Sequence, residues 1–187
     1  MKFLNVFKHT ALVLRHKHKV FWHCVKCGLI WRGIVHDLSK FSPTEFFESV
    51  KYYQGNRSPI GVCRRVTGIS RAWLHHKGRN KHHFEYWRDY SMVERRNVPV
   101  QMPMRFFVEM VCDRIAASKI YRGEKYTDSH PLEYFQNSSD THDMHPKTAA
   151  YLTYVLTMLA ECGEEKTFAY LRSLDKKQEG YPPFGAN

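Results

Sequence analysis

The chain has 187 residues, with 29 Lys and Arg against 18 Asp and Glu, so its formal charge at pH 7 is +11. This length allows one domain and hardly two, and a hydrophobic fraction of 43% excludes an intrinsically disordered chain. No apolar run reaches the roughly 18 residues of a membrane span, and polar residues interrupt the start where a signal peptide would be apolar.

Cysteine and charge content narrow the class further. Five cysteines without the spacing of a disulfide framework indicate reduced thiols, and we therefore expect a cytoplasmic protein. The positive surplus predicts a phosphate-bearing partner, either a small molecule such as a nucleotide or a nucleic acid. The twelve histidines are unusually many for a chain of this length.

Two helices are predicted before residue 54. Lys8, Arg15, Lys19 and Lys26 fall on one narrow stripe at 100° per residue, which predicts a long helix over 6–32, kinked near Gly28. The motif SPTE at 42–45 combines a capping serine, a proline suited to the first helical position and a glutamate three residues after the cap. It predicts a helix over 43–53.

The next part of the chain is more broken. Residues 54–69 hold three Gly, one Pro and three Arg, which predicts a basic loop. Short helices are expected over 71–77, ended by Gly78, and over 82–90. We find no sustained alternation and no hairpin dipeptide, so no strand is predicted.

Helical patterns return in the last third. A helix is expected from Pro103 to about residue 121, followed by a loop-rich stretch over 122–145. Pro146 starts another helix that Gly163 ends, and a short helix follows over 164–173.

Together these elements predict an all-α fold, a compact bundle of six to eight helices. We expect a single domain over residues 1–175 and a loosely ordered C-terminal tail over 176–187. The oligomeric state is not readable from the sequence.

Two aspartates, Asp37 and Asp113, occupy positions typical of metal ligands. His36 and Asp37 are adjacent, so they cannot share one helix face, but both can reach one metal ion where a helix ends or bends. A neutral nitrogen and a hard oxygen together suit Zn, Mn or Fe. Asp113 falls on the apolar face of its helix, where a carboxylate is costly unless it is paired or bound to metal. The alternatives are a chance His-Asp pair at a helix end and a buried ion pair of Asp113.

Histidines supply further candidates. The first helix carries His9, His16, His18 and His23, and periodicity does not choose a ligand among them. The block HHKGRNKHH at 75–83 holds four histidines and three cations within nine residues. Such a mixture offers imidazoles to a metal and cations to a phosphate. The alternative is a basic surface turn that contacts nucleic acid.

Four stretches resemble a known superfamily. They are HKHKV, HDLSKFSPTEF, AWLHHKGRNKHHFEYW and VEMVCDRIAAS, and they resemble the HD-domain superfamily of metal-dependent phosphohydrolases, in a branch found in bacteria and phages. The resemblance covers roughly residues 5–170 and implies a compact helical bundle around a divalent metal ion. The metal ligands it implies are His16, His36, Asp37 and Asp113, with His18 and His23 as the alternatives to His16.

One departure from the superfamily leaves the number of ions open. The extra histidines of its two-metal members lie farther apart in sequence than the two pairs here, which are only seven residues apart. One ion is expected, and a second ion held by His76 and His82 is left open. The ligand types do not distinguish Mn, Fe, Zn, Co, Ni and Mg.

The resemblance implies hydrolysis of a phosphate ester, of a nucleotide or another small molecule, by metal-activated water. In this mechanism Asp37 accepts the proton of the water, Lys40 neutralises phosphate oxygens, and His76 or His82 protonates the leaving oxygen. The expected substrate-binding residues are Lys77, Arg79, Asn80 and His83.

Two other functions compete with this one. A di-iron oxygenase on the same fold needs at least two irons and six protein ligands. A basic nucleic-acid-binding module with a structural or vestigial metal is compatible with the charge of +11 and the Arg-rich segment 54–71.

Overall fold

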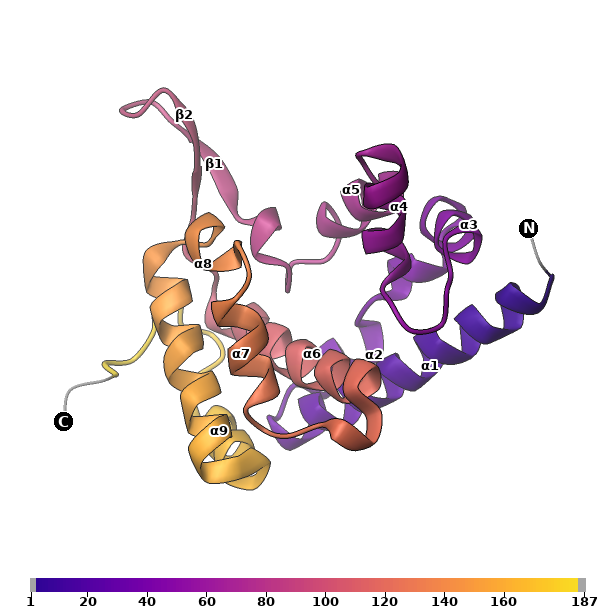
Figure 1. Ribbon diagram of the computed structural model, residues 1–187. Coiled ribbons are helices and arrows are strands. Elements are labelled where there is room, and N and C mark those ends of the chain that lie inside the picture. Colours follow the sequence, from indigo (N-terminus) through magenta and orange to yellow (C-terminus); the bar gives the residue numbers. More distant parts are fainter. Residues whose placement is uncertain (1–2, 185–187) are drawn as a thin grey trace.

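The computed structural model describes residues 3–184, which are mostly helical with one small sheet (Figure 1). The described helices are α1 Phe3–Lys26, α2 Ile30–Val35, α3 Pro43–Lys51, α4 Pro59–Thr67, α5 Arg71–Lys77, α6 Met104–Arg122, α7 His130–Gln136, α8 Asp140–Asp143 and α9 Pro146–Ser173. The remaining elements are the strands β1 Arg88–Ser91 and β2 Arg96–Pro99 and the 3-10 turns η1 Leu38–Phe41, η2 Phe84–Tyr86 and η3 Gly123–Lys125. The helical class is confirmed, but the fold is not purely all-α.

The predicted helix over 6–32 is two helices. α1 ends at Lys26, and Gly28, with φ 77°, turns the chain into α2. Gly33 of α2 packs so closely on α1 that an added Cβ would lie 3.0 Å from the Cβ of Cys24 and 3.1 Å from the Cα of Phe21. The absence of a side chain at position 33 therefore lets the end of α2, and the residues after it, lie against α1.

The middle of the chain is more ordered than predicted. α4 lies inside the segment expected to be a basic loop, with Pro59 in its first turn and Gly68 in a left-handed conformation at its end. These are standard helix-boundary residues, but the internal Gly61 suggested a loop. The short helix over 71–77 is confirmed, and its cap Ser70 accepts a hydrogen bond from the Trp73 amide at 3.0 Å.

The helix expected over 82–90 is wrong. That segment contains η2 and then β1, which pairs antiparallel with β2, Arg88 opposite Pro99. Figure 1 shows this hairpin extending away from the helices. The stretch over 122–145 also differs, because α7 and α8 lie within it.

α6 runs through the core between α1 and α9. Most of its residues from Met104 to Ala116 are buried, and the ring of Phe107 lies 4.8 Å from that of Tyr151 on α9. The predicted break at Gly163 is confirmed as a non-helical residue within α9, with φ 78°. This packing holds α6, and any polar residue on its site-facing side, in a fixed position.

Part of the predicted loose tail contacts this core. The Tyr181 hydroxyl donates a hydrogen bond to the Met102 carbonyl at 2.7 Å, and its ring stacks on Tyr151 at 4.6 Å. Residues 185–187 of the tail lie outside the described part of the chain. Among the described helices, none combines the length and the apolar character needed to cross a membrane.

Candidate metal centre

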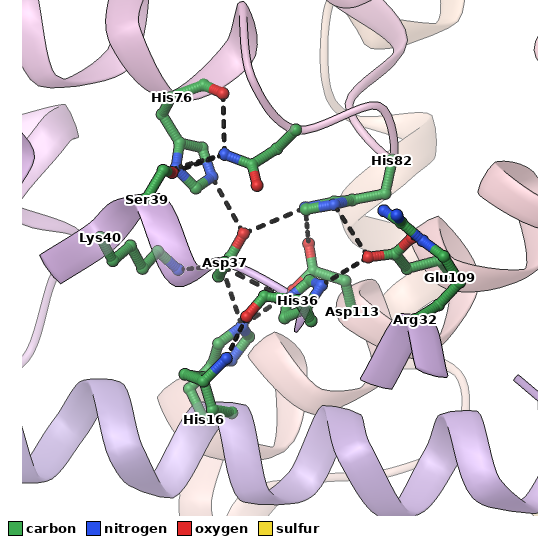
Figure 2. Close-up of polar contacts among 12 residues, drawn as sticks. His16, Arg32, His36, Asp37, Ser39, Lys40, His76, His82, Glu109 and Asp113 are labelled. Carbon is green, nitrogen blue, oxygen red and sulfur yellow. Dashed lines mark hydrogen bonds and ion pairs between the residues drawn. The ribbon is translucent and has the colours of Figure 1, made fainter. Parts of the chain in front are cut away.

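A cluster of imidazoles and carboxylates lies where α1, α5 and α6 meet the segment after α2 (Figure 2). α1 contributes His16 and α6 contributes Asp113, whose Oδ1 lies 2.9 Å from His16 Nε2. Figure 2 shows Asp37 at the centre of the cluster, with the histidines arranged around it. Helices distant in sequence therefore bring ligand-type side chains to one point.

The chain bends at His36 and Asp37, which is the condition for both side chains to reach one point. α2 ends at Val35, His36 is extended, and Asp37 has the left-handed conformation with φ 54°. Aspartate tolerates this conformation better than most residues. Lys17 of α1 donates a hydrogen bond to the His36 carbonyl. The bend turns both neighbouring side chains inward, where each is only 1% exposed.

The two oxygens of Asp37 face two different sets of histidines. Oδ1 lies 3.3 Å from His76 Nε2 and 3.4 Å from His82 Nε2. Oδ2 lies 3.3 Å from His36 Nε2 and 3.8 Å from His16 Nε2. Asp37 therefore sits between two groups of nitrogen atoms.

Ligand atoms within 4.8 Å of one another form groups that could each hold a metal ion. The two inner groups are Asp37 with His76, His82 and His83, and His16 with His36 and Asp113. A third group, His36 with His82 and Glu109, overlaps both. The structure thus contains buried His/Asp/Glu clusters that could bind a metal ion.

Buried glutamates hold the outer nitrogens of these rings. Glu109 Oε1 accepts a hydrogen bond from His36 Nδ1 at 3.0 Å and lies 3.3 Å from His82 Nδ1. Glu45 Oε2 accepts a hydrogen bond from His76 Nδ1 at 2.7 Å. A carboxylate on one ring nitrogen fixes the tautomer and leaves the other nitrogen as a lone-pair donor, which is the usual arrangement behind a metal-binding histidine.

The inner atoms of the cluster lack hydrogen-bond partners. Within the described residues, six buried atoms of the cluster make no well-formed hydrogen bond: His16 Nε2, His36 Nε2, His82 Nδ1, His82 Nε2, His83 Nε2 and Asp37 Oδ1. Buried polar atoms are normally satisfied, because an unpaired one costs roughly 1–3 kcal/mol. Cations held by the groups that face Asp37 would give these atoms partners. The donor set therefore fits a divalent ion of the Zn, Mn or Fe type.

The charges of the cluster favour the ionised carboxylates. Burial alone would raise the pKa of Asp37, but His36 and Lys40 beside it hold that pKa well below the usual range. Asp113 behaves in the same way, with His16 and His36 offsetting its burial. Lys40 Nζ lies 2.5 Å from Asp37 Oδ2, and that carboxylate raises the pKa of Lys40 against the effect of burial. Asp37, Asp113 and Lys40 thus present two carboxylates and one ammonium group to the cavity.

A cavity of about 180 Å³ opens above the cluster. Its polar lining includes His16, Asp37, Lys40, His76, His83 and Asp113. Apolar and aromatic side chains complete its walls, among them Leu12, Val13, Ile60, Trp73, Ile120 and Tyr121. The candidate ligands therefore face a space that a small molecule can enter.

The structure brings most of the predicted site residues together. The cluster and its cavity contain His16, His36, Asp37, Lys40, His76, His82, His83 and Asp113. The alternatives to His16 lie elsewhere. His23 Nδ1 is 3.1 Å from the Cys112 carbonyl in the core, and the exposed His18 accepts a hydrogen bond from Trp22.

Three predicted substrate-binding residues do not line the cavity. Asn80 supports the site from outside, since its Nδ2 donates to Ser39 Oγ at 2.7 Å and to the His76 carbonyl at 2.9 Å. Lys77 is absent from the cavity lining, and Arg79 lines a separate pocket. The reason is helical geometry: α5 turns His76 inward, so the residues that follow it point in other directions.

Glu109 and Glu45 were not among the predicted site residues. Glu109 precedes Asp113 by four residues, so it lies on the same helix face one turn away, and this spacing could have indicated it. In the sequence, Glu45 is part of the capping motif SPTE at 42–45. Its amide does donate to Ser42 Oγ at 3.4 Å, but its carboxylate binds His75 and His76.

Comparison with known proteins places this centre in a family. No curated protein and no solved structure matches the chain. A family model, described as a family of unknown function (DUF5662), matches residues 5–158. This range includes every candidate ligand of the cluster. The chain belongs to the family of unknown function DUF5662.

Proposed function

We propose that this protein is a metal-dependent phosphohydrolase that acts on a small phosphate ester. The observation that carries the proposal is the convergence of unpartnered imidazole nitrogens and two carboxylates at the base of a cavity that Lys40 also lines. A metal centre open to a small cavity, with a cation beside it, suits the chemistry of phosphoryl transfer to water. The resemblance of four sequence stretches to the HD-domain superfamily supports the same assignment.

The arrangement of the ligands supports two ions rather than one. His16, His36 and Asp113 would hold one ion, and His76, His82 and His83 would hold the other. Asp37 would contribute one oxygen to each, because its two oxygens face the two groups. When bound, such ions supply positive charge that polarises a phosphoryl oxygen and lowers the pKa of water.

The side chains of the cavity would act on the substrate directly. Lys40 is a fixed ammonium group in the cavity lining, suited to bind an anionic phosphate oxygen. The apolar wall formed by Leu12, Ile60 and Ile120 excludes water from part of the cavity. His76 is a weaker candidate for the leaving-group acid than the sequence suggested. Its Nδ1 is bound to Glu45 and its Nε2 faces Asp37.

The test combines metal analysis with a substrate panel. The purified protein would be analysed for bound metal and assayed with p-nitrophenyl phosphate and nucleotides in the presence of Mn, Co, Ni or Mg. We expect metal-dependent release of phosphate that is lost in Asp37→Asn. The matched control is Asp89→Asn on the exposed hairpin, which should keep the activity of the wild type.

Three outcomes would overturn the proposal. Full activity in Asp37→Asn would show that the reaction does not need the carboxylate at the centre of the proposed site. Two equivalents of iron without turnover of any phosphate ester would favour the di-iron oxygenase. Salt-dependent binding of DNA or RNA without metal-dependent turnover would favour the nucleic-acid-binding module.

A further inference from the structure

A second pocket, of about 370 Å³, lies apart from the metal centre. Its lining consists of two aromatic side chains and four cations, namely Trp31, Arg32, Arg79, Lys81, Arg105 and Phe106. None of these residues lines the cavity above the metal cluster. They come from α2, the segment between α5 and η2, and the start of α6. Three separate segments therefore place positive charge at one hollow.

The cations of this pocket gather around one ring. The charged groups of Arg32, Lys81 and Arg105 lie 5.0, 5.8 and 4.8 Å from the centroid of the Phe106 ring. Each contact is individually favourable, but like charges this close repel one another. Their proximity costs free energy that a bound anion would offset.

Most of this charge has no counter-charge in the protein. Arg32 Nε donates to Glu109 Oε2 at 2.6 Å, so its charge is balanced. Among residues 3–184, no carboxylate lies within 4.0 Å of the charged groups of Arg79, Lys81 or Arg105, and all three side chains are exposed. Three cations are thus available to an anionic ligand.

Trp31 provides a planar surface at the same pocket. Its side chain is 69% exposed, which is unusual for a large aromatic residue that is not used for contact. An exposed indole beside cations can stack on a nucleobase while the cations bind its phosphates.

We propose that this pocket binds a nucleoside mono- or diphosphate, with the base against Trp31 and the phosphates on Arg79, Lys81 and Arg105. The volume falls within the range of small-molecule pockets, about 300–1,000 Å³. The other basic segment, around α4, contributes no residue to the lining of this pocket. The proposal does not depend on the phosphohydrolase activity, because Arg79, Lys81 and Arg105 do not line the cavity above the metal cluster. The pocket meets the metal centre through Arg32, which pairs with Glu109.

Binding would be measured by calorimetry with ADP, AMP, adenosine, inorganic phosphate and a twelve-nucleotide single-stranded DNA as probes, at constant salt. Titrations with and without EDTA keep binding at the metal centre separate. We expect ADP and AMP to bind. The triple variant Arg79→Gln, Lys81→Gln, Arg105→Gln should lose at least tenfold in ADP affinity. The single variant Trp31→Leu should weaken ADP while leaving inorganic phosphate unchanged.

A matched control removes the same charge elsewhere. Arg57→Gln, Arg65→Gln, Arg71→Gln changes three exposed arginines around α4 and should keep ADP affinity within about twofold of the wild type, since phosphate contacts are local. Equal losses in the two triple variants would show that net charge alone attracts the ligand and would overturn the proposal. Wild-type ADP affinity in the pocket variant, or no binding to the wild type at millimolar ADP, would do the same. If the DNA bound much more tightly than ADP and the pocket variant lost that binding, the ligand of the pocket would be a nucleic acid and not a nucleotide.

Discussion

Replacing Glu109 by glutamine isolates the contribution of the outer carboxylate to the metal centre. Glu109 is fully buried and has both oxygens engaged, one with His36 Nδ1 at 3.0 Å and the other with Arg32 Nε at 2.6 Å. Its neighbours, His36 and His82 among them, lower its pKa to about 2 against the effect of burial. Glutamine preserves the volume and removes the charge, so the substitution tests electrostatics more than packing.

The expected loss of metal affinity follows from what Glu109 does to the rings. Removing the carboxylate behind a ligating histidine costs typically 10- to 100-fold in metal affinity, or about 1.4–2.8 kcal/mol. We place Glu109→Gln toward the larger value, because one carboxylate serves both His36 and His82. The free energy of unfolding should also fall by about 2 kcal/mol, since Arg32 loses the partner of a partly buried ion pair.

The assay is competition for metal with a chromophoric chelator, together with urea unfolding of the metal-free protein. The matched control is Glu164→Gln. Glu164 lies on α9, outside the cluster, and its carboxylate pairs with Lys119 of α6, so this substitution also removes one negative charge and one ion pair. The control should retain the metal affinity of the wild type. If Glu109→Gln folds and binds metal as tightly as the wild type, the histidines do not ligate through the nitrogens that face Asp37.

Three further predictions concern the centre and the frame around it. Asp37→Asn should fold, because asparagine also accepts the left-handed conformation, yet it should lose most of the bound metal in elemental analysis; metal content equal to the wild type would contradict the central role of this residue. Gly33→Ala should lower the free energy of unfolding in urea by about 1–3 kcal/mol, because the added methyl group meets the backbone of α1 at 3.1 Å; an unchanged midpoint would show that α2 can shift freely. Burial lowers the pKa of His23 to about 4. Between pH 7 and pH 5, His23 therefore becomes protonated in the unfolded chain but stays neutral in the folded chain. Stability should therefore fall by about 2 kcal/mol from pH 7 to pH 5 on account of this residue, and urea titrations of His23→Phe should show a correspondingly flatter dependence on pH.

The sequence was most informative where chemistry conflicted with the local pattern. Asp113 stands on an otherwise apolar helix face, and the structure places it 2.9 Å from His16. His36 and Asp37 can reach one metal ion only where the chain bends, and the left-handed Asp37 provides that bend. In both cases a single helix or its end determines the position of the side chain, so the position can be predicted from the sequence alone.

The sequence was least informative where position depends on several segments at once. Lys77 and Arg79 are close in sequence to His76, but the end of α5 turns them away from the cavity. The hairpin has neither alternation nor a glycine at its turn, and the positive φ there falls on Arg95. Glu109 lies one turn from Asp113 on a helix with mostly apolar neighbours, and only the approach of α2 shows what it binds.

The cluster draws its ligands from two unequal parts of the fold. His16 and Asp113 lie on the long helices α1 and α6, whereas Asp37, His76 and His82 lie on the short elements and turns between residues 30 and 87. An ion coordinated by both parts would link them, and its binding free energy would add to the stability of the short elements. In a cell short of that metal, these elements would open first and expose the chain to proteases. Metal supply would then set the lifetime of the protein.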